Sequence, residues 1–231
     1  WREATAAKNT ALTRFDWFRS QNPNSNDQKL ARQQIPPHYV VHMHADIVTA
    51  GGSDGTTSVT SIDIHDIARS CATYGVKKFF LVTPLLDQQA IIKEFTKFWL
   101  SERGANYNKS RFEAISILQV CSSFDEVLER IEAIEGTLPI KISTSAKKAQ
   151  KDETVICYND QEVVWTQNKP VLIILGSGQG LSQKILDASE YLLTPVCGMT
   201  DYNHLSVRSA AAIIIDRWLG LNPSSNPGKG G

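Results

Sequence analysis

Apolar runs alternate with helix-like segments along most of the chain. Runs rich in β-branched and aromatic residues predict strands, and they occupy residues 38–45, 77–84, 112–120, 138–143, 171–175 and 191–196. Apolar positions at helical spacing predict helices between these runs, over residues 61–75, 85–103, 123–136, 158–168, 181–189 and 203–220. About six strand–helix alternations are typical of an α/β fold with a parallel sheet flanked by helices.

Local signals support these limits. Capping boxes are predicted at Thr60–Asp63 and Ser123–Glu126, and C-terminal glycine caps at Gly75 and Gly136. The strand VLIIL, residues 171–175, is apolar at five consecutive positions. We therefore expect helices to cover both of its faces.

The last predicted helix, NHLSVRSAAAIIIDRWLG at residues 203–220, has two unlike halves. Its second half is apolar enough to be buried, whereas its first half carries Asn203, His204, Ser206 and Arg208. Polar side chains are costly at a buried helix unless they have partners. These four residues are therefore candidates for a functional site.

Composition narrows the class of protein. The 231 residues suit one domain with an appendage. Residues 38–221 are expected to form this domain, between an N-terminal helical or linker segment, residues 1–37, and a disordered tail, residues 222–231. Twenty-four basic residues balance 24 acidic ones, so no global field attracts nucleic acid or a membrane. Binding to RNA would need a local patch.

Cysteine usage and hydropathy indicate the compartment. Four cysteines without a CxxC pair favour unpaired thiols in a reducing compartment over a zinc ribbon or a redox dithiol. No apolar run reaches the roughly 18 to 20 residues that cross a bilayer, and no signal-peptide pattern is visible. We therefore expect a cytoplasmic protein.

The loop GSGQG after the strand at residues 171–175 is the segment most expected to contact a ligand. Glycines let backbone N–H groups approach a ligand at a helix N-terminus. The spacing of Gly176, Gly178 and Gly180 is GxGxG, which differs from the dinucleotide fingerprint GxGxxG, and the Lys-Ser/Thr pair of a phosphate loop is absent. A tight turn without a ligand remains the alternative.

Two further clusters contain groups that could do chemistry. His38, His42 and His44 fall on one face of the first strand, where a metal site is the alternative to ordinary strand histidines. The segment Asp63–Asp66, which includes His65, lies at a helix N-terminus, where capping competes with an acid–base role. The chain has no GxSxG nucleophile elbow and no obvious pair of carboxylates for glycoside hydrolysis.

Three segments together resemble the SPOUT class of RNA methyltransferases. DIHDIARSCATYGV has the spacing of the first motif of the SpoU branch at Asp63, Arg69 and Gly75, with aspartate where that branch has asparagine. VLIILGSGQGL is similar to the strand and glycine loop of the second motif, without its glutamate. TPVCG followed by NHLSVRSAAAI resembles the third motif, with Ser206 and Arg208 where that branch has asparagine and serine.

The resemblance is most specific to a smaller bacterial group of predicted SPOUT RNA methyltransferases. The segments IDIHDIARSCATYGV and YNHLSVRSA are similar to phrases of that group, and the likeness covers about residues 38–220. Separately, WREATAAKNTALTRFD resembles the closing helix of bacterial tRNA guanine methyltransferases, at Trp1, Arg2, Ala6, Lys8, Thr10, Arg14 and Asp16. This likeness suggests the hypothesis that the chain is the C-terminal part of a longer protein with such an enzyme upstream.

The resemblance to the SPOUT class implies a deep C-terminal trefoil knot, S-adenosyl-L-methionine as cofactor, and a homodimer with the site at its interface. It implies that the cofactor contacts Leu175, Gly176, Gly178, Gly180, Pro195, Val196, Gly198, Leu205, Ser206 and Val207. RNA contact falls to Arg69 and Arg208, since a guanidinium can bind a phosphate through two parallel hydrogen bonds. With Asp63 and His204 they form the expected catalytic set, while the groups that could remove a proton are Asp63, His65, Asp201 and His204.

The main hypothesis is an S-adenosylmethionine-dependent RNA methyltransferase acting on tRNA or rRNA, without a metal, DNA or a membrane. The alternative is a non-catalytic knotted module for RNA binding or dimerisation, appended to a tRNA methyltransferase. Neutral charge and the missing motif glutamate suggest that alternative. A small-molecule enzyme that uses another nucleotide fits less well, because the glycine loop matches neither nucleotide fingerprint.

Overall fold

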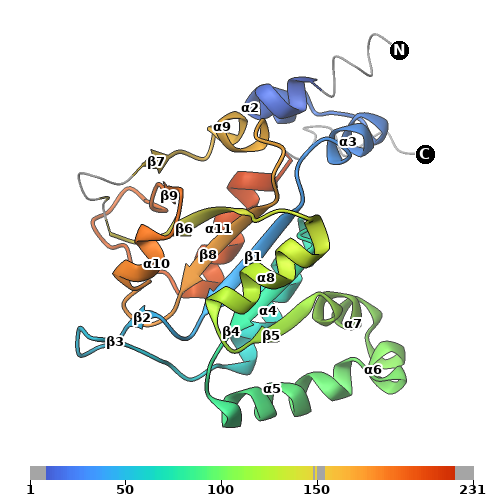
Figure 1. The fold of residues 1–231 in the computed structure, drawn as a ribbon. Helices are drawn as coiled ribbons and strands as arrows, with labels where there is room; N and C mark the ends of the chain where they lie inside the picture. Colours follow the sequence, from blue (N-terminus) through green and yellow to red (C-terminus); the bar gives the residue numbers. More distant parts are fainter. Residues whose placement is uncertain (1–8, 148, 150–153, 222–231) are drawn as a thin grey trace.

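A seven-stranded parallel sheet forms the centre of the chain in the computed structural model, which describes residues 9–147, 149 and 154–221 (Figure 1). The strand order is β5-β4-β1-β8-β6-β9-β7, and all paired strands are parallel. The strands are β1 (His38–Met43), β4 (Lys78–Val82), β5 (Leu118–Cys121), β6 (Ile140–Thr144), β7 (Val155–Ile156), β8 (Val171–Gly176) and β9 (Tyr191–Leu193). A separate antiparallel pair consists of β2 (Ile47–Val48) and β3 (Asp54–Gly55). The predicted α/β fold with a parallel sheet is confirmed, whereas the trefoil knot stays a prediction.

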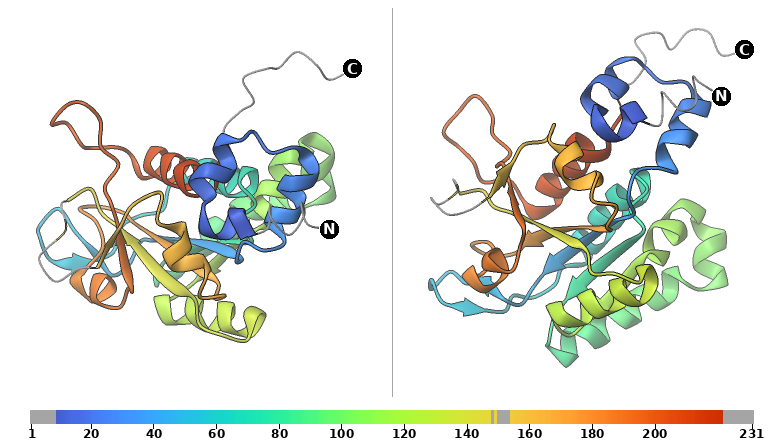
Figure 2. Two further views of the ribbon diagram at one scale, coloured as in Figure 1. Left: turned by 90° about the horizontal axis from the view of Figure 1, so that it is seen from above. Right: turned by 45° about the horizontal axis from the view of Figure 1, so that its top comes forward.

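Helices cover both faces of the sheet (Figure 2). Val40 and Leu81 face one hydrophobic cluster, which takes buried side chains from α2 (Phe15–Ser20), α3 (Ser25–Arg32), α4 (Ser61–Thr73), α5 (Leu86–Trp99), α7 (Lys109–Ser116), α9 (Gln161–Trp165) and α11 (Val207–Leu219). Val41 and Val82 face the other cluster, with α8 (Phe124–Glu135) and α10 (Gln183–Asp187). The strand β8 is therefore covered on both sides, as its apolar sequence predicts.

The predicted helix caps are present. The side chain of Thr60 accepts a hydrogen bond from the Asp63 N–H at 3.3 Å, and that of Ser123 accepts one from the Glu126 N–H at 3.2 Å. Gly136 ends α8 with φ of +74°, a left-handed conformation that disfavours residues with a Cβ atom. These caps fix where α4 and α8 begin and end.

Two predicted elements between residues 85 and 120 are wrong in their limits. The predicted strand 112–120 is helical up to Ser116, where α7 ends, and only Leu118–Cys121 pairs with β4. The apolar residues of this run include Ala114 and Ile115, which are buried in the helix, and a short apolar run does not distinguish a buried helix from a strand. The predicted helix 85–103 divides into α5 and a short helix, α6 (Glu102–Tyr107), because Ser101 caps a new helix by accepting from the Gly104 N–H.

The polar half of the last predicted helix is not helical. The helix α11 begins at Val207, and Ser206 is its N-cap, accepting from the Ser209 N–H at 3.3 Å. Asn203 to Leu205 form a loop instead. The polarity of this stretch therefore belongs to a loop and a cap, where polar side chains satisfy backbone groups or face solvent.

The helix α2 is joined to α11 and to the loop before α9. The guanidinium of Arg19 donates to the Arg217 carbonyl at 2.8 Å and to Asn159 Oδ1 at 2.9 Å. Phe15 and Phe18 are buried in the same cluster as α11. The predictions made for residues 1–8, with Trp1, Arg2, Ala6 and Lys8, and for the tail 222–231 lie outside the described residues.

The four cysteines occupy two kinds of surroundings. Cys71 and Cys121 are buried, and burial raises the pKa of the Cys121 thiol to about 12. Cys157 and Cys197 are exposed, and all four are unpaired. Two of the four thiols thus pack as small apolar side chains, and two face solvent.

Candidate active site

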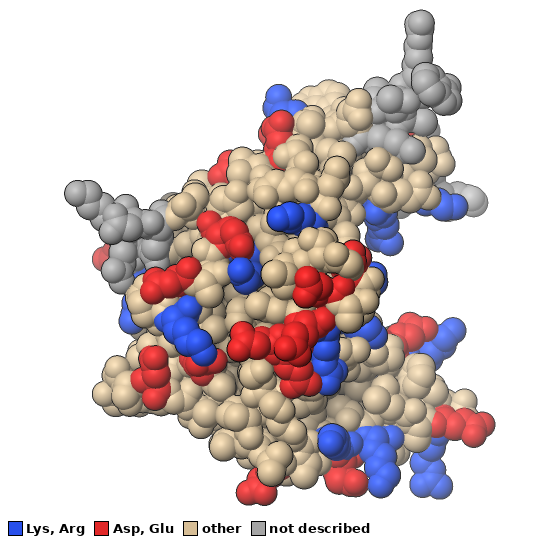
Figure 3. Space-filling view, viewed as in Figure 1, with Lys and Arg blue, Asp and Glu red and all other residues tan. Residues whose placement is uncertain are grey.

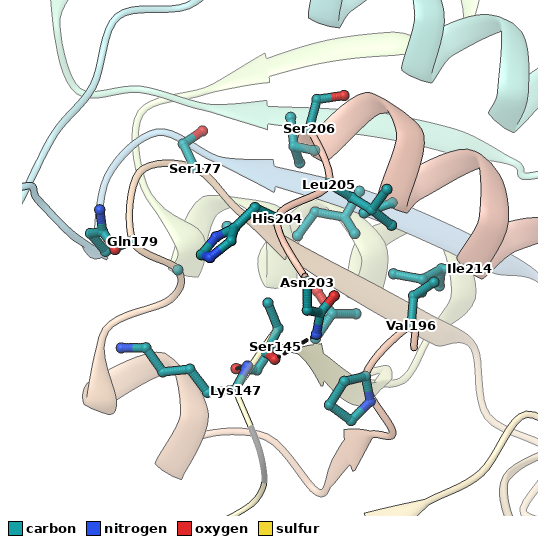
Figure 4. A pocket seen from close by; sticks show the side chains of 18 of the residues that line it. Ser145, Lys147, Ser177, Gln179, Val196, Asn203, His204, Leu205, Ser206 and Ile214 are labelled. Carbon is teal, nitrogen blue, oxygen red and sulfur yellow. Dashed lines mark hydrogen bonds between the residues drawn. The ribbon is translucent and has the colours of Figure 1, made fainter. Parts of the chain in front are cut away.

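A cavity of about 670 Å³ lies at the carboxyl edge of β1, β8, β6 and β9 (Figure 4). The segments that follow these strands and the start of α11 form its walls, through residues 44, 57–58, 63, 144–147, 158, 175–180, 193–196, 201, 203–207, 210 and 214. Open α/β sheets bind ligands outside the carboxyl ends of their strands, and ligand pockets have volumes of roughly 300 to 1,000 Å³. This cavity is therefore the candidate active site.

The glycine loop after β8 is pinned against the segment after β1. The N–H groups of Ser177 and Gln179 donate to the carbonyls of Met43 and Val48, at 3.1 and 2.8 Å, and the Gly180 N–H donates back to Ser177 at 3.0 Å. Gly178 has φ of +60°, and a Cβ atom there would lie 2.7 Å from the Val48 carbonyl oxygen. Since protein carbonyls already occupy these N–H groups, the loop forms a close wall and not a cradle for phosphate.

Most of the residues predicted for the site come together in this cavity. Asp63, His204 and Asp201 line it, as do nine of the ten predicted cofactor contacts, Leu175, Gly176, Gly178, Gly180, Pro195, Val196, Leu205, Ser206 and Val207. Gly198 is exposed and lies outside the lining. The predicted set thus contributes to walls from β8, from β9 and from the start of α11.

The two predicted RNA-binding arginines lie outside the cavity lining. Arg69 is exposed on α4. Arg208 joins α11 to α4, with its Nε 3.3 Å from Asp63 Oδ1 and its Nη1 3.7 Å from Asp66 Oδ2. Asp63 also accepts the hydroxyl hydrogen of Thr60 at 2.5 Å, so this carboxylate combines a helix cap with an ion pair at the cavity wall.

Several cavity residues carry no signal in the sequence pattern. Most come from segments after the strands, whose neighbourhood depends on strand order, and two come from α11: Thr57, Ser58, Thr144, Ser145, Ala146, Lys147, Tyr158, Ser177, Gln179, Ala210 and Ile214. Asn203 shows how the loops meet, because its side-chain amide donates to the Ala146 carbonyl at 2.9 Å (Figure 4). Only Ser177 and Gln179, between predicted glycines, could have been inferred from the loop itself.

The three strand histidines divide between the ends of β1. His38 Nδ1 lies 2.7 Å from the Pro36 carbonyl, and its Nε2 accepts from the indole N–H groups of Trp165 and Trp218, at 3.1 and 3.0 Å. Burial lowers the pKa of His38 to about 4, so the imidazole is neutral.

His65, a predicted base, packs edge-on against Phe95 and Trp99 and lies outside the cavity lining. Over the described ranges, no group of three or more His, Cys, Asp or Glu residues could hold a metal ion.

Charge is mixed over the face seen in Figure 3, where acidic side chains gather near the centre. Acidic side chains follow α8, at Asp125, Glu126, Glu129, Glu132 and Glu135. This helix covers the sheet face opposite α4 and α11. A polyanion would be repelled by the α8 face. In the described part of the chain, no helix is long and apolar enough to cross a membrane.

The cavity is partly apolar and lies beside a glycine loop at the carboxyl edge of a parallel sheet. These features are typical of α/β proteins that bind a small organic molecule. The chain belongs to the SAM-dependent RNA methyltransferase family, because residues 37–220 match the sequence profile of that family. The protein is therefore an RNA methyltransferase that uses S-adenosylmethionine, as the resemblance of its motifs predicts.

The chain is also similar to individual relatives in sequence and to solved structures in fold. The chain is 32% identical over 190 residues to an uncharacterised protein of Aquifex aeolicus, covering 80% of this chain and 89% of that protein. It is 32% identical over 225 residues to a tRNA (guanine-N(1)-)-methyltransferase of Oleidesulfovibrio alaskensis, covering 95% of this chain but 52% of that protein, so it spans about half of this relative. The SpoU methyltransferase AviRb from Streptomyces viridochromogenes has the same fold, with a TM-score of 0.51 at 15% identity over 82% of this chain and 62% of that one.

The residues of the cavity fit the cofactor of the family. Leu175 and Leu193 are buried at its wall, beside Val196, Val207 and Ile214, and provide apolar contact for a flat base. At Gly176 a Cβ atom would lie 2.7 Å from the Leu181 backbone nitrogen, so glycine preserves this wall. The buried hydroxyl of Tyr158 has no hydrogen-bond partner among the described residues. Such a group is available to a polar atom of the bound molecule.

Proposed function

We propose that this cavity holds S-adenosylmethionine beside the acceptor nucleotide of an RNA, and that the RNA is a tRNA. The observation that carries the proposal is the convergence of the loops after β8 and β9 and the start of α11 on one cavity, in a chain of this family. The similarity to the tRNA (guanine-N(1)-)-methyltransferase of Oleidesulfovibrio alaskensis favours tRNA over rRNA. S-adenosylmethionine supplies an electrophilic methyl group when it is bound.

The proposed role of the lining residues is to fix and desolvate the reactants, because an in-line displacement depends mainly on orientation. Leu175, Pro195, Val196, Leu205 and Val207 would cover the faces of the cofactor's base. The backbone of Gly176, Gly178, Gly180 and Ser206 would form the wall beside its polar edge. Gly198, which lies outside the lining, is left out of this set.

Asp63, Asp201 and His204 are the predicted proton acceptors that line the cavity. We propose that one of them receives a proton from the acceptor atom when that atom carries one. The ion pair with Arg208 keeps Asp63 at the wall. Arg69 is exposed on α4, the same helix as Asp63, and is proposed to contact an RNA phosphate.

Calorimetry with S-adenosylmethionine and S-adenosylhomocysteine tests the first half of the proposal. We expect both to bind in the micromolar range or tighter, and no binding at millimolar concentration would favour a non-catalytic RNA-binding module. Transfer of a tritiated methyl group tests the second half, with bulk tRNA and bulk rRNA from a strain that lacks this gene. Label in rRNA alone would refute the choice of tRNA.

We further propose a cytoplasmic homodimer, on the basis of the resemblance to the SPOUT class. Light scattering coupled to gel filtration would report twice the 25.6 kDa mass of the chain. A monomer with full methyl-transfer activity would contradict the proposed assembly.

A further inference from the structure

His44 is a buried histidine at the wall of the cavity. It directly follows β1, and its backbone N–H donates to the Val82 carbonyl at 2.9 Å. Only 2% of its surface is exposed. Its Nδ1 lies 3.1 Å from Thr57 Oγ1 and 3.3 Å from Ser177 Oγ. Its Nε2 is buried and has no hydrogen-bond partner among the described residues. One ring nitrogen is thus held by the protein, and the other is a buried polar atom without a partner in a residue of the cavity wall.

The hydroxyl of Ser177 joins His44 to a second histidine. Ser177 Oγ lies 2.8 Å from His42 Nε2, and the centroids of the two imidazole rings are 4.2 Å apart. Burial lowers the pKa of His44 to about 4 and that of His42 well below its usual range. Both rings are therefore neutral near pH 7, so His44 is suited to hydrogen bonding and is a weak proton acceptor.

The cavity has two chemically different sides. Because β8 and β6 lie between β1 and β9, the residues after β1 and those after β9 occupy opposite sides. Next to the end of β9 the wall carries the apolar side chains of Leu193, Pro195 and Val196. The β1 side is polar, with His44, Thr57, Ser58 and the nearby carboxylate of Asp63. The flat faces of the cofactor's base fit the apolar residues, and the polar atoms of an acceptor nucleotide fit the β1 side.

We propose that His44 Nε2 hydrogen-bonds the RNA nucleotide that receives the methyl group, and that Ser177 and Thr57 orient the ring by holding Nδ1. This inference rests on the proposed transfer of a methyl group to RNA in this cavity. His44 contacts the acceptor and fixes its orientation, and it takes no proton. His42 shares the Ser177 contact but lies outside the cavity lining, so its role is structural.

Two substitutions at His44 separate the roles of its ring nitrogens. His44→Gln places an amide near the position of Nε2, whereas His44→Asn places one near Nδ1, beside Thr57 and Ser177. If His44 contacts the acceptor, Gln should retain methyl transfer to bulk tRNA from the deletion strain, and Asn should lose about tenfold, with kcat falling more than KM changes. If His44 only supports the fold, the order is reversed, because Asn keeps the network contact. That reversal would overturn the inference.

Binding measurements separate failure of this inference from failure of the proposed function. S-adenosylhomocysteine should bind wild type, His44→Gln and His44→Asn within about twofold, and His42→Asn should match wild type in methyl transfer. A loss of cofactor affinity in both His44 variants would place the residue in the cofactor wall and refute the inference. In histidine-¹⁵N-labelled protein saturated with S-adenosylhomocysteine, added tRNA should shift the side-chain signals of His44 and not those of His38. A spectrum unchanged by tRNA would refute it even if methyl transfer is absent.

Discussion

The buried histidines at the two ends of β1 differ in whether their ring nitrogens have hydrogen-bond partners. At the amino end, both ring nitrogens of His38 have partners, the Pro36 carbonyl and the indole groups of Trp165 and Trp218. At the carboxyl end, His42 Nδ1 and His44 Nε2 have no partner among the described residues. Burial lowers the pKa of all three.

The difference indicates that the amino end of β1 stabilises the fold, whereas its carboxyl end serves the cavity. A buried polar atom without a partner costs about 1–3 kcal/mol, so the unpaired atoms at the carboxyl end destabilise the unliganded protein. His44 is part of the cavity wall, where we propose that a bound nucleotide pairs with its Nε2. The amino end, without unpaired ring atoms, contributes stability. Substitutions at the two ends should therefore affect different measurements.

The largest effect is expected from His38→Leu. The substitution leaves the buried indole N–H groups of Trp165 and Trp218 without their acceptor, and we expect the free energy of unfolding to fall by about 4 kcal/mol. Urea unfolding followed by tryptophan fluorescence measures this loss. The matched variant His42→Leu should cost about 1–2 kcal/mol, because the Ser177 hydroxyl loses its contact with His42 but keeps the one with His44 Nδ1. Equal losses for the two variants would remove the proposed difference between the ends.

Acid should weaken the fold next most strongly. The pKa of His38 is about 4 in the folded protein against 6.5 as the ordinary value, so between these pH values the unfolded chain binds a proton that the folded protein does not. The free energy of unfolding therefore rises with pH across this window. The contribution of His38, about 3 kcal/mol, is fully present above pH 6.5. Urea titrations at pH 7, 6 and 5 test this expectation. A flat profile would show that His38 is protonated in the folded state without cost.

A smaller effect is expected from Gly178→Ala. Strain at φ of +60° and a close approach to the Val48 carbonyl should cost about 1–2 kcal/mol and weaken S-adenosylmethionine binding at least tenfold. Gly136→Ala is the control, because its φ of +74° gives similar strain while nothing lies within 4 Å of the added Cβ. Calorimetry should show unchanged cofactor affinity for the control. Equal affinities for the two variants would argue that the β8 loop is only a tight turn.

The smallest change in stability is expected from Arg208→Gln and Arg69→Gln. The Arg208 side chain is 34% exposed, and such ion pairs contribute less than about 1 kcal/mol. Both variants should keep their cofactor affinity and lose methyl transfer to tRNA, since the arginines are proposed to act on RNA. A variant with normal methyl transfer would exclude its arginine from RNA contact.

Elements with a strong period or cap could be predicted from the sequence, whereas proximity across the sheet could not. The helix α4, with its Thr60 cap, and the strand β8 match their predicted positions closely. The run FEAIS was predicted as a strand because five residues do not separate the two periods, and its packing in α7 decides the outcome. Asn203 to Leu205 were assigned to a helix because the apolar pattern of α11 has no break before its Ser206 cap.

The same limit applies to the site. Predicted cofactor contacts such as Gly176 and Pro195 come from motifs that are continuous in sequence, and they line the cavity. His44 was grouped with His38 and His42 by strand period alone, and period does not show which end of a strand opens into a cavity. That information depends on β8 pairing with β1, which places Ser177 beside His44.

The pairing of β1 also affects how the chain folds during synthesis. β1, β4 and β5 are adjacent in the sheet and come early in the chain, so this half can form while the ribosome is still adding residues. The other edge of β1 pairs with Val171–Gly176, so its N–H and C=O groups remain unpaired until β8 emerges. Such a long-range pairing is slow to form, and an open apolar edge can pair with other chains. Chaperone binding to nascent chains should therefore be strongest between synthesis of β5 and β8.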